Sequence, residues 1–126
     1  MIFSLMETRM YHYAYMILCT DFTLYAGYTN NLQRRFQMHL TGKGAKYTRA
    51  HKPLTFAYYH AFDTKSEALK HEAMIKKLSR KAKLELIDSD MNQFMPARSL
   101  SIARTRSLES WANQVMDLAR DISLYE

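Results

Sequence analysis

An arginine and a histidine in the first half of the sequence have the spacing and the chemistry to act together. Arg35 and His39 are four residues apart, so on a helix both side chains project from one face. A helical wheel places them beside Leu32, Phe36 and Leu40, at the margin of an apolar stripe. A cation and an imidazole there could grip a phosphate group, but polar side chains that snorkel from the margin of a core give the same pattern.

A carboxylate lies on the apolar side of a second helical segment. Glu72 falls on the stripe that contains Ala68, Leu69 and Ile75. Burying a bare carboxylate is costly, so the group must be paired, protonated or bound to a cation. The Glu72 carboxylate could be a hard oxygen ligand for Mg²⁺, or it could form a salt bridge to Arg35.

Two tyrosines fall on segments that pair as a hairpin. Residues 11–19 and 24–29 are rich in Tyr, Leu and Ile, which predicts two strands. Asp21 lies between them and can bond its own backbone two residues on, which predicts a turn and antiparallel pairing. Tyr15 and Tyr25 therefore lie on adjacent strands. An aromatic ring in a strand is usually part of the packing, and a shared polar site is the alternative.

The segment after the hairpin predicts a helix and then a basic loop. Asn30 or Asn31 is a good N-cap for a helix that ends near Thr41, and Gly42 suits the position after the helix. Residues 42–52 then form a loop with two glycines and several cations. The loop residues that could track a nucleic-acid backbone are Lys43, Lys46, Tyr47, Arg49 and Lys52.

A third strand and two more helices complete the first part of the chain. Residues 54–62 carry four aromatic rings and predict a strand. Thr64 and Glu67 have the spacing of a capping box, which opens a helix to about residue 78. A short helix to residue 87 follows.

The last third of the chain has a different character. Residues 89–106 contain a proline and several serines without a clear period, which predicts a linker. Apolar residues then recur at helical spacing and predict an amphipathic helix over residues 107–123. These residues are Leu108, Trp111, Ala112, Val115, Ala119 and Ile122. The apolar face should dock on its own domain or on a second copy of the chain, or the segment is disordered.

Length and composition limit the architecture. A chain of 126 residues with 48% hydrophobic residues supports one domain with a core. The single cysteine, Cys19, fits a reducing compartment and is expected to be a buried small side chain. The start of the sequence lacks the features of a secretory signal, and no stretch is long enough to span a membrane. We therefore expect a cytoplasmic protein.

Positive charge is concentrated in the middle of the sequence. Residues 31–87 hold 13 Lys and Arg against four acidic residues, a net charge of +9, whereas the whole chain carries +6. A basic stretch of this kind is typical of a polyphosphate partner. A basic surface that serves only solubility is the alternative.

The sequence resembles the GIY-YIG nuclease family over about residues 11–87. The triplet YAY that ends at Tyr15, followed ten residues later by YAG at residues 25–27, is similar to the paired motifs that name the family. The run TNNLQRRFQMH, with Arg35 and then His39, resembles the family's helix. The runs GKGAKYTRAHKP and SEALKHEAMIKKLSR resemble its small stand-alone bacterial branch and place Glu72 at the metal-binding glutamate.

The motifs depart from the family pattern at positions where the family has Gly or Ile. Tyr13 and Ala14 replace the Gly and Ile of the first motif, and Ala26 replaces the Ile of the second. Both tyrosines and Gly27 are retained. The tail after Asp88 matches nothing in the resemblance.

The resemblance implies a fold and a reaction. The fold would be an α/β (α+β) nuclease domain over residues 11–88 around a small three-stranded antiparallel sheet flanked by helices. The reaction would be phosphodiester hydrolysis with one divalent metal, Mg²⁺ or Mn²⁺, held by Glu72. Arg35 would clamp the phosphate, and Tyr15 would orient or deprotonate the attacking water. Tyr25 and His39 would complete the hydrogen-bond network.

The resemblance also implies a partner. Nucleic acid is the expected substrate, with DNA preferred over RNA and single-stranded or structured DNA favoured, in a setting such as DNA repair. Gly27 would allow a close backbone approach. The chain would be a monomer or a weak homodimer through its C-terminal helix. The alternative function is a catalytically inactive nucleic-acid-binding module on the same scaffold.

Overall fold

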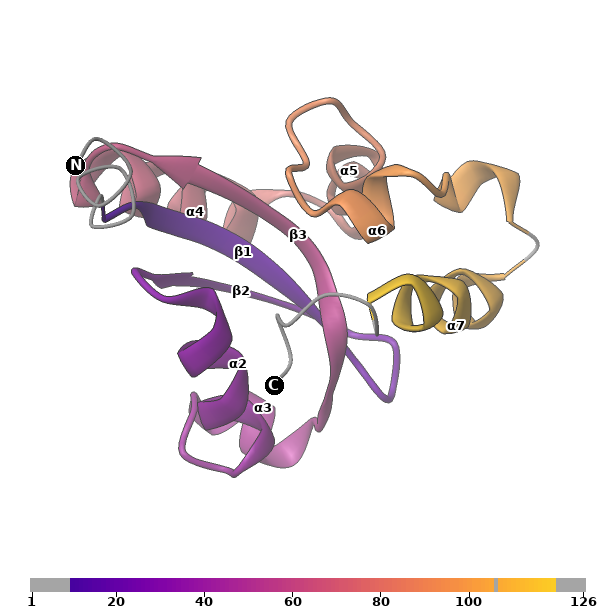
Figure 1. Cartoon of the computed structure of the whole chain (residues 1–126), viewed down its shortest axis with the longest axis horizontal. Helices are drawn as coiled ribbons and strands as arrows, with labels where there is room; N and C mark the ends of the chain where they lie inside the picture. The colour runs from indigo at the N-terminus through magenta and orange to yellow at the C-terminus, as the bar shows by residue number, and fades with distance from the viewer. Residues whose placement is uncertain (1–9, 106, 120–126) are drawn as a thin grey trace, which may run out of the picture.

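The computed structural model describes residues 10–105 and 107–119. Its centre is a three-stranded antiparallel sheet in the order β2-β1-β3, formed by β1 (His12–Cys19), β2 (Leu24–Thr29) and β3 (Pro53–Phe62). Helices surround this sheet: α2 and α3 lie beside β2, whereas α5, α6 and α7 lie beyond β3 (Figure 1). The predicted α/β architecture with three antiparallel strands is confirmed.

The turn between β1 and β2 follows the predicted chemistry. The backbone N–H of Thr23 donates to Oδ1 of Asp21 at 3.2 Å. Phe22, with φ 63°, supplies the left-handed residue of the turn. This turn sets the register in which Tyr15 lies opposite Gly27 on β2. On its other side Tyr15 lies opposite Tyr59 of β3.

The two faces of the sheet are covered by different helices. α2 (Leu32–Leu40) covers the face that carries Tyr15, because His39 of α2 bonds the Tyr15 hydroxyl. α4 (Lys65–Lys77) covers the opposite face, where His71 bonds the hydroxyl of Tyr58. Because Tyr58 pairs with Met16, the neighbour of Tyr15 on β1, the two tyrosines point in opposite directions.

The ends of α2 are fixed as its sequence predicts. The side chain of Asn31 accepts from the backbone N–H of Arg34 at 3.0 Å. Gly42, with φ +76°, follows the helix in a conformation that favours glycine. The predicted basic loop is in part wrong, since it contains the short helix α3 (Lys46–Ala50). Five residues between two glycines and a proline gave no periodic signal.

The first two helices after β3 begin at a side-chain cap, and the first of these caps was predicted. Thr64 accepts from the backbone N–H of Glu67 at 3.2 Å and donates its hydroxyl to that carboxylate at 2.7 Å. Ser79 caps α5 (Arg80–Ile87) through the backbone N–H of Ala82. Both caps satisfy N–H groups that the first turn of a helix leaves without a partner.

Residues 89–105 of the segment predicted as a linker pack against the sheet. It contains α6 (Met95–Arg98) and the 3₁₀ turn η1 (Ile102–Arg104). The buried Asn92 side chain donates to the carbonyl oxygens of Ala57 at 2.9 Å and Ile87 at 2.8 Å. These bonds attach the segment to β3 and α5. The sequence signal was weak because the buried residues Asn92, Phe94 and Ala97 of the segment do not recur with one period.

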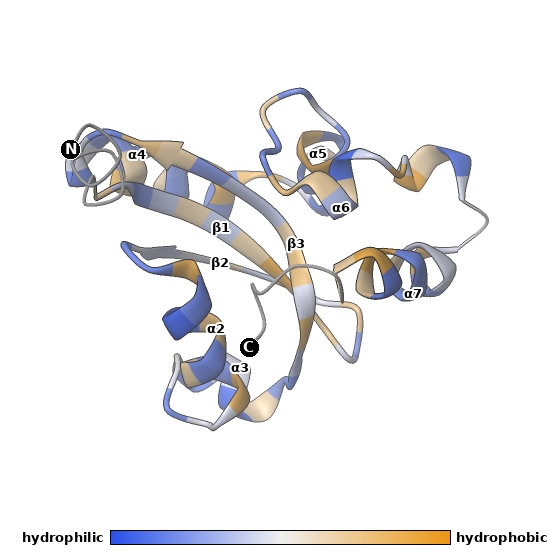
Figure 2. Cartoon of the chain, viewed as in Figure 1, coloured by the Kyte–Doolittle hydropathy of each residue, from blue (hydrophilic) through white to orange (hydrophobic). Residues whose placement is uncertain are grey.

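The predicted amphipathic helix is α7 (Leu108–Ala119), which presents both apolar and polar residues (Figure 2). Trp111 and Val115 on its apolar face are fully buried, and the Trp111 indole N–H donates to the carbonyl oxygen of Leu100 at 3.2 Å. α7 thus docks on its own chain, against α6 and β3. Ile122, also assigned to this helix, lies outside the described residues.

Two further expectations concern membrane-spanning helices and Cys19. Among the described helices, none is both long and apolar enough to cross a membrane. Cys19 is fully buried in the core, as expected. Burial raises the pKa of its thiol to about 11, so the side chain is a packing element and a poor nucleophile.

Candidate functional site

Tyr15, Arg35 and His39 meet on the face of the sheet that α2 covers. The Tyr15 hydroxyl lies 2.9 Å from Nε2 of His39 and accepts from Nε of Arg35 at 3.3 Å. The spacing of Arg35 and His39 on α2 therefore directs both side chains to one strand residue. The tyrosine is fully buried, and its hydroxyl contacts both Arg35 and His39.

Thr48 of α3 is a member of the site that sequence reasoning missed. Its Oγ1 lies 2.6 Å from Nδ1 of His39 and donates to the carbonyl oxygen of Ala45 at 3.0 Å. Since the hydroxyl has one proton, it accepts from the Nδ1–H of His39. Nε2 then carries the lone pair and accepts from the Tyr15 hydroxyl. A threonine in a basic loop gave no signal without its position in space.

Two glycines provide the space for these side chains. A Cβ at Gly27 would lie 2.4 Å from the Tyr15 hydroxyl oxygen, and a Cβ at Gly44 would lie 2.2 Å from Nδ1 of His39. Gly27 was expected to allow a close approach, and the approaching group is the ring of Tyr15. Gly44 was missed, because its role depends on a histidine five residues earlier in the chain.

Burial sets the protonation states of the cluster. It raises the pKa of Tyr15 to about 12, against the opposing effect of the Arg35 hydrogen bond. Burial and the nearby Arg35 charge lower the pKa of His39 to about 4. At neutral pH the tyrosine is therefore a neutral donor and the histidine a neutral acceptor. His39 is also almost completely buried, and both of its ring nitrogens have protein partners.

Tyr25 is the more accessible tyrosine of the pair. It is partly buried, and its ring meets His39 edge-on, with ring centroids 5.5 Å apart. Burial opposes the charge on Arg35, but hydrogen bonds to Tyr15 and Tyr25 leave the pKa of the guanidinium raised overall. Arg35 is thus shared between a buried tyrosine and a half-buried one.

An aromatic stack joins Tyr25 to the basic loop. The ring of Tyr47 lies nearly parallel to that of Tyr25 (centroids 5.6 Å apart, 19° between planes) and to that of His51 (4.2 Å, 15°). His51 in turn pairs with Asp21 in the β1–β2 turn. Tyr47 therefore has two aromatic partners within the protein. Its side chain ties the loop to β2.

The cations of the loop are on the surface. Lys43, Lys46, Arg49 and Lys52 are exposed. Arg49 and Lys52 border a cavity of about 430 Å³ that reaches His39 and Thr48. The structure therefore brings part of the basic loop next to the buried end of the site.

Glu72 lies on α4 and is separate from the hydrogen-bonded cluster. Its side chain is 17% exposed and forms an ion pair with Lys76 at 3.4 Å; among the described residues it has no ion pair with Arg35, so that alternative is excluded. Its charge contributes the smallest of the effects that raise the pKa of Tyr15. Within the described chain no three potential ligands among His, Cys, Asp and Glu gather around one point.

A single carboxylate is nevertheless a suitable donor set for Mg²⁺. Mg²⁺ usually keeps several water ligands and binds through one or two carboxylates and the phosphates of its substrate. Glu72 offers such an oxygen, and its only ion pair in the described structure is a 3.4 Å contact with the exposed Lys76. The residues present therefore fit a metal held by one protein ligand.

Residues 11–85 match the GIY-YIG catalytic domain. This match covers more than half of the chain and contains every site residue described above. The chain belongs to the GIY-YIG family, a nuclease superfamily. As expected from its motifs, its relatives are small stand-alone bacterial proteins.

These relatives carry the name UPF0213. A UPF0213 protein of Oceanobacillus iheyensis is 54% identical over 77 residues, which cover 61% of this chain and 90% of the relative. One from Bacillus licheniformis is 47% identical over 96 residues, or 74% of this chain and 98% of the relative. A solution NMR structure of a UPF0213 protein from Bacillus halodurans, 39% identical, covers 73% of this chain and 98% of its own with a TM-score of 0.45.

Proposed function

We propose that this protein is a metal-dependent endonuclease that hydrolyses phosphodiester bonds in DNA. The observation that carries the proposal is the convergence of Arg35 with Tyr15, Tyr25 and His39 at one point of the sheet. A buried ring pair alone would serve packing. The positively charged guanidinium of Arg35 beside these rings provides a binding group for an anion.

Arg35 binds the scissile phosphate. Its planar guanidinium fits two oxygens of a phosphate, and its Nε contact with the Tyr15 hydroxyl is long, at 3.3 Å. Tyr15 and His39 beneath it are positioning residues. They fix the direction of the guanidinium, which reduces the entropy that is lost when the substrate binds.

The two tyrosines have different roles from those expected from the sequence. Tyr25 is the residue that meets the attacking water, because it is only partly buried while Tyr15 is fully buried. Tyr25 orients the attacking water through its hydroxyl, and the adjacent Arg35 cation stabilises the negative charge that develops on the phosphate. Tyr15 holds Arg35 and His39 in place for this step.

Glu72 is the residue that would hold a divalent metal, Mg²⁺ or Mn²⁺. Such a cation neutralises charge on the phosphate and on the leaving oxygen. The partial burial of Glu72 limits competition from bulk water. Lys76, at 3.4 Å, neutralises the carboxylate in the absence of the metal.

The substrate is nucleic acid, as the family implies, and we propose DNA that is single-stranded or structured. The described domain is small and has no separate element for reading bases, which argues against strong sequence specificity. Its net charge of +9 over residues 31–87 supports binding through the phosphate backbone.

A nucleic-acid-binding module without catalysis is the second candidate. The full burial of Tyr15 favours it, because the hydroxyl of one motif tyrosine is closed to solvent. The two candidates differ in whether the phosphodiester bond breaks, which can be measured directly.

A cleavage assay with a matched pair of variants tests the proposal. Single-stranded, duplex and branched DNA, and RNA, are incubated with Mg²⁺, Mn²⁺ or EDTA. Cleavage should require the metal and fall at least about 10²-fold in Glu72→Gln, with nucleic-acid binding retained. Glu85→Gln on the exposed side of α5 is the control and should cleave normally. Binding without cleavage of any substrate would select the second candidate.

A further inference from the structure

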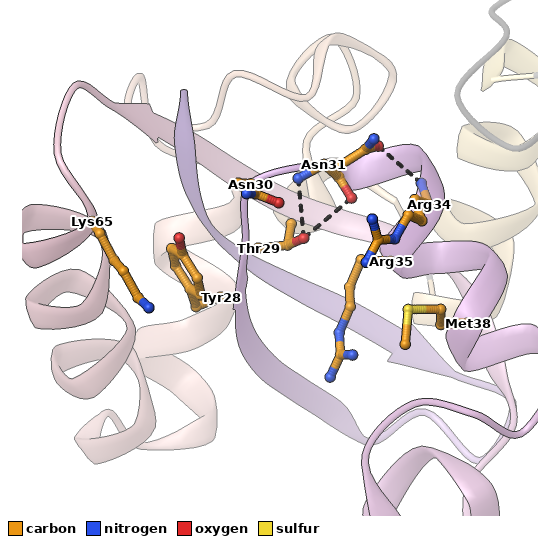
Figure 3. A pocket seen from close by; sticks show the side chains of 8 residues that line it. All are labelled: Tyr28, Thr29, Asn30, Asn31, Arg34, Arg35, Met38 and Lys65. Atoms are coloured by element: carbon orange, nitrogen blue, oxygen red, sulfur yellow. Dashed lines mark hydrogen bonds between the residues drawn. The ribbon is translucent and has the colours of Figure 1, made fainter. Parts of the chain in front are cut away.

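A polar pocket lies at the open edge of β2, beside Arg35 (Figure 3). Its volume is about 260 Å³, and it is bordered by β2, by the start of α2 and by the first residue of α4. We refer to it as the β2-edge pocket. Its lining residues are Tyr28, Thr29, Asn30, Asn31, Arg34, Arg35, Met38 and Lys65.

The charges of this pocket have one sign. Arg34, Arg35 and Lys65 line it, and no acidic side chain does. Among the described residues, none of these three cations takes part in an ion pair. Three neighbouring cations repel one another unless an anion lies between them. The pocket is therefore suited to an anionic ligand.

The cations approach from two sides. Arg34 and Arg35 come from α2, and Lys65 comes from α4 across the edge strand (Figure 3). Lys65 lies over the ring of Tyr28, with Nζ 5.6 Å from its centroid. Tyr28 is itself held by the contact of its hydroxyl with Nδ1 of His12 at 2.7 Å. The lysine thus has an ordered platform, which reduces the entropy lost when it binds a ligand.

We infer that the β2-edge pocket is a second phosphate subsite, which holds the phosphodiester next to the one that Arg35 clamps. This inference rests on the proposed function and names the part of the substrate that the pocket takes. Arg34 and Lys65 are the residues specific to this subsite. Arg35 borders both positions, so adjacent phosphates of one strand occupy them.

The size of the pocket supports part of a polymer as its occupant. Pockets that enclose a whole small molecule typically have volumes of about 300–1,000 Å³, and this one is smaller and polar. A phosphate with its sugar needs less space than a complete nucleotide. The side chains of Asn30 and Asn31 add neutral hydrogen-bonding groups at the rim, which suit the ester and sugar oxygens.

Binding of two small ligands tests the subsite without cleavage. Thymidine 5′-monophosphate offers one phosphate, and thymidine 3′,5′-bisphosphate offers two that are separated by one sugar. Affinities are measured by titration calorimetry in EDTA. The wild-type protein should bind the bisphosphate roughly tenfold more tightly, because the second phosphate gains charge-assisted contacts. An equal affinity for both ligands would overturn the inference.

Paired variants locate the effect. Arg34→Gln with Lys65→Gln should abolish the preference for the bisphosphate. Lys70→Gln with Lys81→Gln removes two exposed cations elsewhere on α4 and α5 and should keep it. Arg34 and Lys65 are exposed, so the fold should survive, and thermal melting checks this. An equal loss in both double variants would overturn the inference in favour of general charge attraction.

The outcome is independent of catalysis. A preserved bisphosphate preference in a protein that cleaves nothing would support the subsite and refute the nuclease proposal. Metal-dependent cleavage in a protein without that preference would support the nuclease and refute the subsite.

Discussion

The Tyr15 hydroxyl lies 2.9 Å from Nε2 of His39 and joins the central strand to the first helix. The other ring nitrogen of His39 is bound by Thr48 at 2.6 Å. The imidazole is therefore fixed at both ends, and its neutral tautomer with the proton on Nδ1 is the one that satisfies all three groups. The orientation of Arg35 depends on this arrangement, because its Nε donates to the same hydroxyl.

Replacement of Thr48 by valine should disturb the site without leaving a cavity in the core. Thr48→Val keeps the side-chain shape but removes the acceptor for Nδ1–H of His39. We expect cleavage to fall about 10–100-fold, as is typical when a partner that orients a functional histidine is lost. The ¹⁵N shifts of the His39 ring should also show a change of tautomer. Thr48→Ser is the control and should restore both. Unchanged ring shifts in Thr48→Val would contradict the assigned tautomer.

Alanine at Gly27 or Gly44 should destabilise the fold through the site. The added Cβ would lie 2.4 Å from the Tyr15 oxygen or 2.2 Å from Nδ1 of His39, so each ring must move. We expect a loss of roughly 1–3 kcal/mol in the free energy of unfolding for each variant, measured in urea. Gly42→Ala is the control: its Cβ has no neighbour within 4 Å, although φ is +76°. Gly42→Ala should lower the free energy of unfolding, because alanine disfavours this φ. The His39 ring resonances should stay unchanged.

The basic loop should account for part of the salt dependence of DNA binding. Neutralised phosphates release counterions, with a log-log slope near −0.7 for each contact on single strands. Replacement of Lys43, Lys46 and Lys52 by Ala should make the slope less steep. Replacement of Lys70, Lys77 and Lys81, which are also exposed, should have a smaller effect. Equal effects of the two triple variants would place the binding face elsewhere.

Acidification should destabilise the fold through His39. Its folded-state pKa is lowered to about 4, whereas an unfolded histidine titrates near ~6.5. Below ~6.5 the unfolded chain takes up a proton that the folded chain refuses, so stability falls as the pH drops from about 6.5 towards 4. The loss is on the order of 3 kcal/mol. His71, whose pKa burial also lowers, acts in the same direction.

Urea unfolding between pH 7 and pH 4 measures this loss. His39→Gln removes the titrating group, so its stability should depend less on pH than that of the wild type. Asp21, with a pKa lowered to about 2, would act mainly below pH ~4. If the two proteins show the same pH dependence, then His39 is not the group responsible.

The sequence alone determined the features that depend on neighbouring residues. The caps at Asn31 and Thr64 follow from contacts three residues apart along the chain. The common direction of Arg35 and His39 follows from the period of one helix. Local spacing was sufficient in each case, because the interacting groups belong to the same turn of backbone.

The tertiary structure decided which of these groups share a site and what each can do there. Thr48 and Gly44 enter the site only because α3 folds back onto His39. The strand pattern could not distinguish the buried Tyr15 from the more open Tyr25, because both alternate in the same way along the sheet. Glu72 pairs with Lys76 on its own helix, and the described residues show no ion pair between it and Arg35. Burial and contacts between distant segments come from packing, which a linear pattern does not contain.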